Sequence, residues 1–220
     1  MVKVINKIFT EQAESAVVPA QKKLEPDVKI KPFSEFLDKK TMTAYLVSAG
    51  RYGGQAVLDK LKIDLAFDGF DKKIVDRLSK QANLLITTVD ETTKERIATI
   101  ISEGREAGLN PNEIRNLIVE RFKEISYDRA DMIVHAETAN AIGTVELITA
   151  KQNGIKKKRW ITSHDDLVSE GCWENEQAGE IAIDADFPSG DQAPPRHPRC
   201  RCYVDEIIDD DYINTDPYIG

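Results

Sequence analysis

Four residues near the end of the printed sequence are of types that bind metal: Cys172, His197, Cys200 and Cys202. Thiolate and imidazole are the usual ligands of structural zinc. His197 and Cys200 are three residues apart in the segment P-P-R-H-P-R-C-R-C, where the prolines exclude a helix and predict a rigid turn. Such a turn can bring both side chains together, and Cys202 can join them if the backbone bends sharply. If Cys172 folds back from its own turn, the four residues form a possible structural zinc site.

The spacing of these ligands leaves two other interpretations open. A standard zinc knuckle has a CxxC pair, whereas the segment around Cys172 supplies one thiol, and Ser169 three residues earlier is a poor ligand. The cysteines can instead be buried thiols that pack a small domain beside a hydrogen-bonded histidine. A disulfide is the third interpretation, but Cys200 and Cys202 are poorly placed to bridge each other, and three cysteines leave one unpaired.

The most tempting enzyme motif is H-A-E at His135 and Glu137, because zinc deaminases use H-x-E followed by P-C-x-x-C. The chain has P-x-C-x-C instead. His135 and Glu137 also fall within an expected helix, which places them about 200° apart around its axis. A local pairing of His135 with Asp131 is the simpler interpretation.

A metal-dependent hydrolase or nuclease is a further alternative, with His164, Asp165, Asp166 and His197 around the ion. The two aspartates are equally suited to form a turn with their own backbone. A thiol enzyme that uses Cys172 and His197 would need an activated thiolate, and the sequence shows no group that activates one. We therefore expect no catalytic residues and no enzymatic activity.

The composition is that of an ordinary globular protein, with 41% hydrophobic and 31% charged residues. The formal net charge of −8 argues against nonspecific wrapping of DNA, which needs lysine and arginine to neutralise phosphates. No apolar run approaches the roughly 20 residues that cross a bilayer, and the first residues do not resemble a signal peptide. We expect no membrane contact and a reducing cytoplasm, which favours free or metal-bound cysteines.

Apolar periodicity predicts a mainly helical α+β protein. Proline residues in 1–32 favour a partner-dependent N-terminal arm, and 33–153 is predicted to be a helical domain with a break or kink at Gly50 to Gly54. Asn110-Pro111 with Glu113 resembles a capping box. Further helices are expected over 71–85, 91–108 and 127–153. Residues 154–207 are expected to form a small knuckle with strands near 157–162, 180–183 and 202–207, and 208–220 an acidic tail.

The run Lys156, Lys157, Lys158 and Arg159 is the strongest local positive charge. A solvated strand or linker is the simpler interpretation. Contact with packaged DNA or with an acidic protein surface is the functional one.

The second half of the chain resembles the head-morphogenesis minor head proteins of tailed phages, the family of phage Mu protein F. The pattern is a helix with R-A-x-x-I, then G-I-x-K-x-R-W, an acidic turn, C-x-x-N-E-x-x-G-x-I, F-P-S-G and P-P-x-H-P-x-C-R-C. The matching positions are Arg129-Ala130, Ile133, Glu137-Thr138, Gly154-Ile155, Arg159-Trp160, Asp165-Asp166, Cys172, Asn175-Glu176, Gly179, Ile181, Phe187 to Gly190 and Pro194 to Cys202. The chain departs from the family in two places: Ser169 replaces a cysteine of fuller knuckles, and His135 stands where a basic residue is more usual.

This resemblance implies a minor head protein of a phage or prophage that acts in head morphogenesis. Its implied partners are the portal protein and the major capsid or scaffolding protein, with an effect on DNA packaging or delivery. The implied location is the virion, in the capsid interior or at the portal vertex, after assembly in the host cytoplasm. The knuckle would then be a structural clip filled by Trp160, Ile181 and Phe187. The alternative from another class is a metal-dependent hydrolase or toxin-like effector that uses the same cysteines and histidines.

Overall fold

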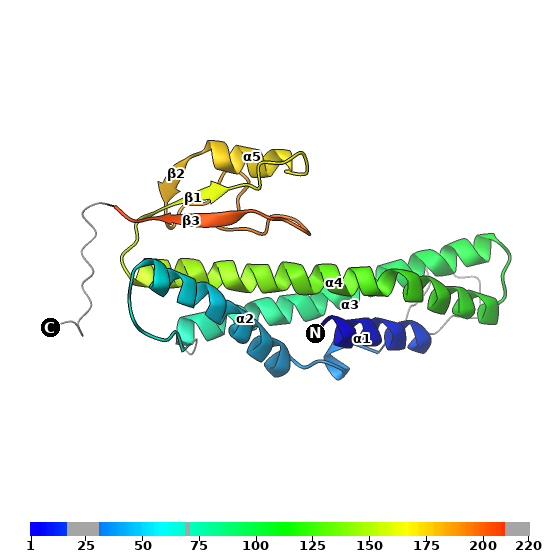
Figure 1. The fold of residues 1–220 in the computed structure, drawn as a ribbon. Helices are drawn as coiled ribbons and strands as arrows, with labels where there is room; N and C mark the ends of the chain where they lie inside the picture. The colour runs from blue at the N-terminus through cyan, green and yellow to red at the C-terminus, as the bar shows by residue number, and fades with distance from the viewer. Residues whose placement is uncertain (17–30, 69–70, 210–220) are drawn as a thin grey trace. The chain divides into compact units, whose positions relative to one another are not determined.

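The computed structural model describes residues 1–16, 31–68 and 71–209, with the side chains of 123–127 left out. The described residues are mainly helical and carry a small antiparallel sheet near the C-terminal end, which confirms the predicted fold class (Figure 1). The elements, in chain order, are α1 (Val2–Ser15), η1 (Phe33–Glu35), α2 (Lys39–Lys60), α3 (Lys72–Glu106), α4 (Pro111–Gln152), β1 (Lys157–Ile161), α5 (Glu170–Gln177), β2 (Glu180–Ala182) and β3 (Tyr203–Ile207).

The chain forms two compact units. Unit 1 comprises Met1–Thr43 and Ser79–Val134, and unit 2 comprises Ala44–Leu78 and His135–Gly220. The long helices α3 and α4 contribute to both. This division differs from the predicted boundary at residue 153, because part of α4 packs with the sheet instead of ending a separate helical domain.

Unit 1 includes the first helix, which we had expected to belong to a partner-dependent arm. Helix α1 buries Ile5, Ile8 and Phe9. The Arg129 guanidinium of α4 lies 4.4 Å from the centre of the Phe9 ring and donates a hydrogen bond to Thr93 of α3. Burial, with a smaller effect of Arg96, lowers the pKa of Arg129 to about 10. Residues 1–16 therefore pack within unit 1, whereas 17–30 of the expected arm lie outside the described residues.

Of the break or kink predicted at Gly50 to Gly54, the break is wrong, because α2 continues through these glycines. A Cβ at Gly53 would overlap the carbonyl oxygen of Ile142, and one at Gly50 would lie 2.5 Å from Val145 Cγ2. Both neighbours belong to α4. The glycines therefore allow α2 and α4 to approach closely within unit 2, and the local flexibility that glycine lends a chain is overridden by this packing.

Helices predicted as separate pieces are continuous in α3 and in α4. The predicted capping box at the start of α4 is confirmed: Asn110 Oδ1 accepts from the Glu113 backbone N–H, and the Glu113 carboxylate accepts from the Asn110 N–H. The predicted stop at Gly108 is confirmed by its left-handed φ of 75°. Local capping signals were therefore readable in the sequence, whereas the gaps between apolar patterns were not helix ends.

The three-stranded sheet of unit 2 has the order β2-β1-β3, and β1 is antiparallel to both neighbours. All three strands agree with the predicted ranges to within one residue at each end. The sheet buries Trp160, Phe187, Val204 and Cys172, with Leu147 of α4 packed against them. The Trp160 and Phe187 rings meet edge to face with centres 5.2 Å apart. Trp160, Phe187 and, partly buried, Ile181 are thus the apolar filling, as predicted.

Candidate metal centre

Three of the four predicted ligands converge at one edge of this core. One ligand atom from each of Cys172, His197 and Cys200 lies within 4.8 Å of the other two. Cys172 belongs to α5, and the other two belong to the proline-rich turn before β3. The Cys200 backbone N–H donates to the His197 carbonyl at 3.1 Å, which closes the tight turn expected from their spacing. Cys172 is fully buried, whereas His197 and Cys200 are half-buried.

The His197 ring is oriented as a metal-binding imidazole requires. Its Nδ1 lies 3.0 Å from the Pro198 carbonyl oxygen, and its Nε2 lies 3.4 Å from the Cys172 Sγ. Because a carbonyl oxygen only accepts, Nδ1 carries the ring proton and Nε2 keeps its lone pair in the neutral ring. In zinc-binding histidines, the ring nitrogen that does not bind the metal usually donates its N–H to an acceptor such as a carbonyl, and this hydrogen bond fixes the tautomer.

The fourth predicted ligand, Cys202, lies next to the group but outside the set of mutually close atoms. Its thiol contacts the side chains of Cys200 and Cys172. Burial is the main cause that raises the pKa of Cys202 to about 12, and the Trp160 indole N–H acts in the opposite sense. Within the described residues that buried indole nitrogen makes no hydrogen bond of ordinary geometry. All three cysteines are free thiols, so the disulfide interpretation finds no support.

These distances fit one soft metal ion. Two ligands of a tetrahedral zinc ion, with bonds of about 2.3 Å to sulphur and about 2.0 Å to nitrogen, stand roughly 3.5 Å apart. The separation of 3.4 Å between Cys172 Sγ and His197 Nε2 matches that value. The other pairs of ligand atoms are at most 4.8 Å apart, so only a small contraction is needed to reach tetrahedral geometry. The Cys172, His197 and Cys200 group can therefore bind a metal ion.

Ser169 is the N-cap residue of α5, and its side chain makes no capping hydrogen bond. Its hydroxyl oxygen is buried without a hydrogen-bond partner in the described part of the chain. It lies outside the converging group, which comprises residues 172, 197 and 200.

Asn175 and Ser189, both in the resemblance pattern, bind each other. The Asn175 amide donates to the Ser189 hydroxyl at 2.8 Å and accepts from the Ser189 backbone N–H at 3.0 Å. The same hydroxyl donates to Asp191 at 2.8 Å. Asn175 is fully buried, so this network fixes the F-P-S-G turn onto α5. Sequence reasoning did not pair these residues, because no local spacing links a helix to a loop that follows a strand.

His164 and Asp165, considered as catalytic residues, are also engaged within the fold. His164 Nε2 lies 2.8 Å from Glu176 Oε1, and the Glu176 carboxylate also accepts from Thr162. Burial would raise the pKa of Glu176, but the hydrogen bonds from Thr162 and His164 outweigh it and lower that pKa. The Arg201 guanidinium holds the pKa of Asp165 below its ordinary value through an ion pair at 2.7 Å.

The basic run 156–159 is exposed at Lys156, Lys157 and Arg159, as expected of a solvated strand, and buried at Lys158. Lys158 is fully buried, donates to the Gln192 carbonyl at 2.9 Å and lies 5.2 Å from the centre of the Phe187 ring. Arg159 pairs with Asp205 at 2.7 Å, and Lys157 lies 3.5 Å from Glu180. The alternation of a strand predicts this, because it places Lys158 on the same face as Trp160. Sequence reasoning missed Lys158 as a buried residue of the sheet.

Comparison with protein-family models, with curated proteins and with solved structures finds no match to this chain. Among the described residues, no helix has both the length and the apolar run that spanning a bilayer requires.

Proposed function

We propose that this chain is a structural protein without enzymatic activity, in which a zinc ion clips the turn before β3 to α5. The observation that carries the proposal is the convergence of Cys172, His197 and Cys200 on one point. The geometry favours a clip over an active site because a catalytic zinc needs an open position that substrate can reach. Here one ligand is fully buried, and a further thiol, that of Cys202, stands beside the group.

Cys172, His197 through Nε2 and Cys200 would hold the ion, and Cys202, whose thiol lies beside the group, would complete a closed set of four. Zinc supplies no reaction in such a site; it joins segments that are distant in sequence and stabilises their packing. The supporting observation is that the surrounding polar residues contact each other. Asn175 pairs with Ser189, and Asp165 pairs with Arg201.

By the resemblance of its motifs, the protein would act as a minor head protein of a tailed phage or prophage, in procapsid assembly and at the portal vertex. The portal protein is the first partner to test, followed by the major capsid or scaffolding protein. Contact with packaged DNA through 156–159 would rely on the exposed Lys156, because Lys158 is buried and both Lys157 and Arg159 already lie beside carboxylates.

The assembly role is tested by co-expression with the portal protein of the same genome, followed by affinity purification of the portal. We expect the chain to co-purify at low and at moderate salt. Cys200→Ser should lose zinc and weaken co-purification, while His164→Ala, which alters an exposed histidine outside the converging group, should do neither. A folded Cys200→Ser variant that still assembles would contradict the clip, and absence of any complex would contradict the assembly role. A hydrolytic activity lost in a folded Cys200→Ser variant would favour the metal-dependent hydrolase instead.

A further inference from the structure

Strand β3 connects the candidate ligands to a charged contact with α2. It begins immediately after the candidate ligands Cys200 and Cys202, and its other end carries Asp205 and Glu206. At a strand rise of about 3.3 Å per residue, Cys202 and Glu206 lie roughly 13 Å apart along one rigid segment. A contact that fixes the far end therefore also limits where the ligand end can lie.

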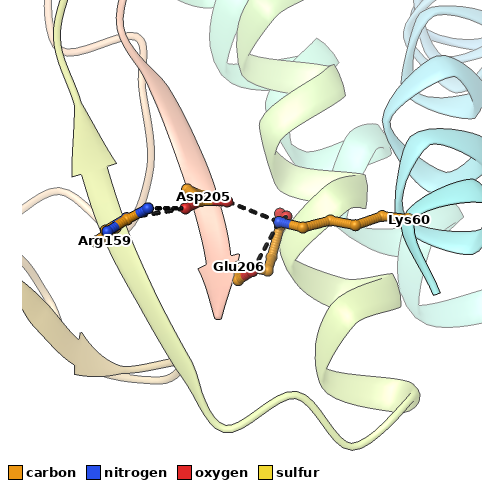
Figure 2. Close-up of polar contacts among 4 residues, drawn as sticks. All are labelled: Lys60, Arg159, Asp205 and Glu206. Carbon is orange, nitrogen blue, oxygen red and sulfur yellow. Dashed lines mark hydrogen bonds and ion pairs between the residues drawn. The ribbon is translucent and has the colours of Figure 1, made fainter. Parts of the chain in front are cut away.

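That contact is made by one ammonium group. Lys60 Nζ, in the last turn of α2, donates to Asp205 Oδ1 at 2.8 Å and to the Glu206 carbonyl oxygen at 2.7 Å, and lies 3.1 Å from Glu206 Oε2 (Figure 2). Arg159 of β1 binds the other carboxylate oxygen of Asp205 at 2.9 Å (Figure 2). Lys60 thus joins α2 to β3, and Arg159 joins β3 to its neighbour in the sheet.

Water would replace this contact poorly. The Glu206 side chain is only 4% exposed, and that of Lys60 is 33% exposed. Glu206 Oε1 is buried without a hydrogen-bond partner among the residues described, so Lys60 supplies the only positive charge in direct contact with this carboxylate there. Burial would lower the pKa of Lys60, but Asp205 and Glu206 outweigh it and raise that pKa. Removal of Lys60 would leave a buried carboxylate uncompensated, which favours movement of β3 toward water.

We infer that Lys60 is a positioning residue for the metal centre, because it holds β3 so that Cys200 and Cys202 are preorganised beside Cys172. This inference rests on the proposed metal function and adds to it a regulator that touches no ligand. A ligand set already in place binds an ion more tightly than one that must be ordered first. Thermodynamic linkage makes the effect reciprocal. If the Lys60 contact raises the affinity for metal by a given factor, metal binding strengthens the Lys60 contact by the same factor.

The test is the zinc affinity of the full chain, measured by competition with a chromophoric chelator, for the wild type and Lys60→Met. Lys60→Met should bind zinc about fivefold to tenfold more weakly, in the range typical of coupling between distinct sites. Lys151→Met is the matched control, because it removes an ion pair between two exposed side chains, Lys151 and Asp184, that does not involve β3. It should change the affinity by less than about twofold.

Equal zinc affinities for folded Lys60→Met and wild type would overturn the inference while leaving the metal site intact. A wild type that binds no zinc would overturn both the metal function and this inference. If Lys60→Met fails to fold by circular dichroism, Glu206→Gln decides, because it removes the charge and keeps the volume. Its zinc affinity should fall by about fivefold, the lower end of the range typical of coupling between distinct sites. An unchanged affinity would then overturn the inference.

Discussion

A hydrogen bond within the protein orients the His197 ring for metal binding before any metal is bound. The Pro198 carbonyl fixes the proton on Nδ1, so Nε2 faces the Cys172 sulphur as an acceptor. His164 offers a useful contrast in the same unit, since its Nε2 is bound to a carboxylate. The two histidines have the same chemistry and different neighbours, so their variants separate metal binding from folding.

His197→Ala should remove the visible absorption bands of cobalt(II) bound in place of zinc, because those bands need tetrahedral coordination and the variant lacks one of the ligands that would provide it. His164→Ala should leave the bands unchanged. The measurement is a cobalt(II) titration of each purified variant, followed by zinc displacement. Retention of the wild-type spectrum in His197→Ala would remove this histidine from the site.

Glu146 on α4 is an ionisable residue that the sequence did not single out. Burial raises its pKa to about 7, with a further contribution from Glu206 and an opposing one from Lys60. When folding raises the pKa of a carboxyl group, the protonated group makes its full contribution to stability at pH values below the unfolded pKa. That contribution is lost as the pH rises through about 7.

Glu146→Gln should therefore be more stable than wild type at about pH 8, by roughly 1–2 kcal/mol after allowance for solvent screening. At about pH 4.5 the two proteins should be nearly equal, because Glu146 is then protonated in the native state. Urea unfolding at both pH values measures the difference. A stability difference that is the same at both pH values would show that Glu146 does not titrate in this range.

At the scale of elements, the contact between α2 and α4 depends on glycine at positions where a side chain would meet backbone. Gly53→Ala would gain helix propensity but would push against the Ile142 carbonyl, so we expect a net loss of about 1–3 kcal/mol. Gly104→Ala is the control in α3, because its Cβ would meet the Ile114 side chain, which can move. Thermal unfolding should rank Gly53→Ala well below Gly104→Ala, and the reverse order would contradict this packing account.

The loop that carries F-P-S-G is held to α5 by one buried amide. Asn175→Ala would leave the Ser189 N–H without its acceptor, at a cost of about 2–3 kcal/mol. Asn112→Ala, an exposed change near the start of α4, should cost less than about 0.5 kcal/mol. Urea unfolding of both variants provides the comparison. Equal stabilities would mean that the network does not fix the loop.

At the scale of the whole molecule, metal removal should act on one unit. A chelator should speed amide hydrogen exchange in β1, α5 and β3, because the clip that joins them is lost. Exchange in α1 should stay unchanged, since α1 packs within unit 1. Mass spectrometry with and without chelator measures both. Uniform acceleration in the two units would show that zinc stabilises the chain by another route.

The sequence predicted what is decided locally. The capping box at Asn110, the stop at Gly108 and the tight turn from His197 to Cys200 follow from contacts between near neighbours, and the strand ranges follow from local residue composition. Prediction from the sequence failed where contacts between distant segments determine the structure. Gly53 looked like a helix break because its neighbour Ile142 is far away in sequence, and Lys158 looked solvated because its acceptor, the Gln192 carbonyl, lies beyond another helix and strand.

His197 and Cys200 were predicted by their spacing, whereas Cys172 was predicted as a ligand by residue type alone. Cys172 is remote from His197 in sequence, and only the fold of α5 against the sheet brings its sulphur within 3.4 Å of the imidazole. Cys202, predicted as a fourth ligand, lies beside the group but outside the set of mutually close ligand atoms. The contacts of Lys60 with Asp205 and Glu206 had no signal in the sequence, because ion pairs between distant elements follow no local pattern.

The most direct test of the clip is native mass spectrometry of the full chain purified without chelator. Wild type should carry one zinc ion per chain, while Cys172→Ser and His197→Ala should carry none at the same concentration. A metal-free wild type that remains folded, with the same mass after zinc is added, would contradict the account.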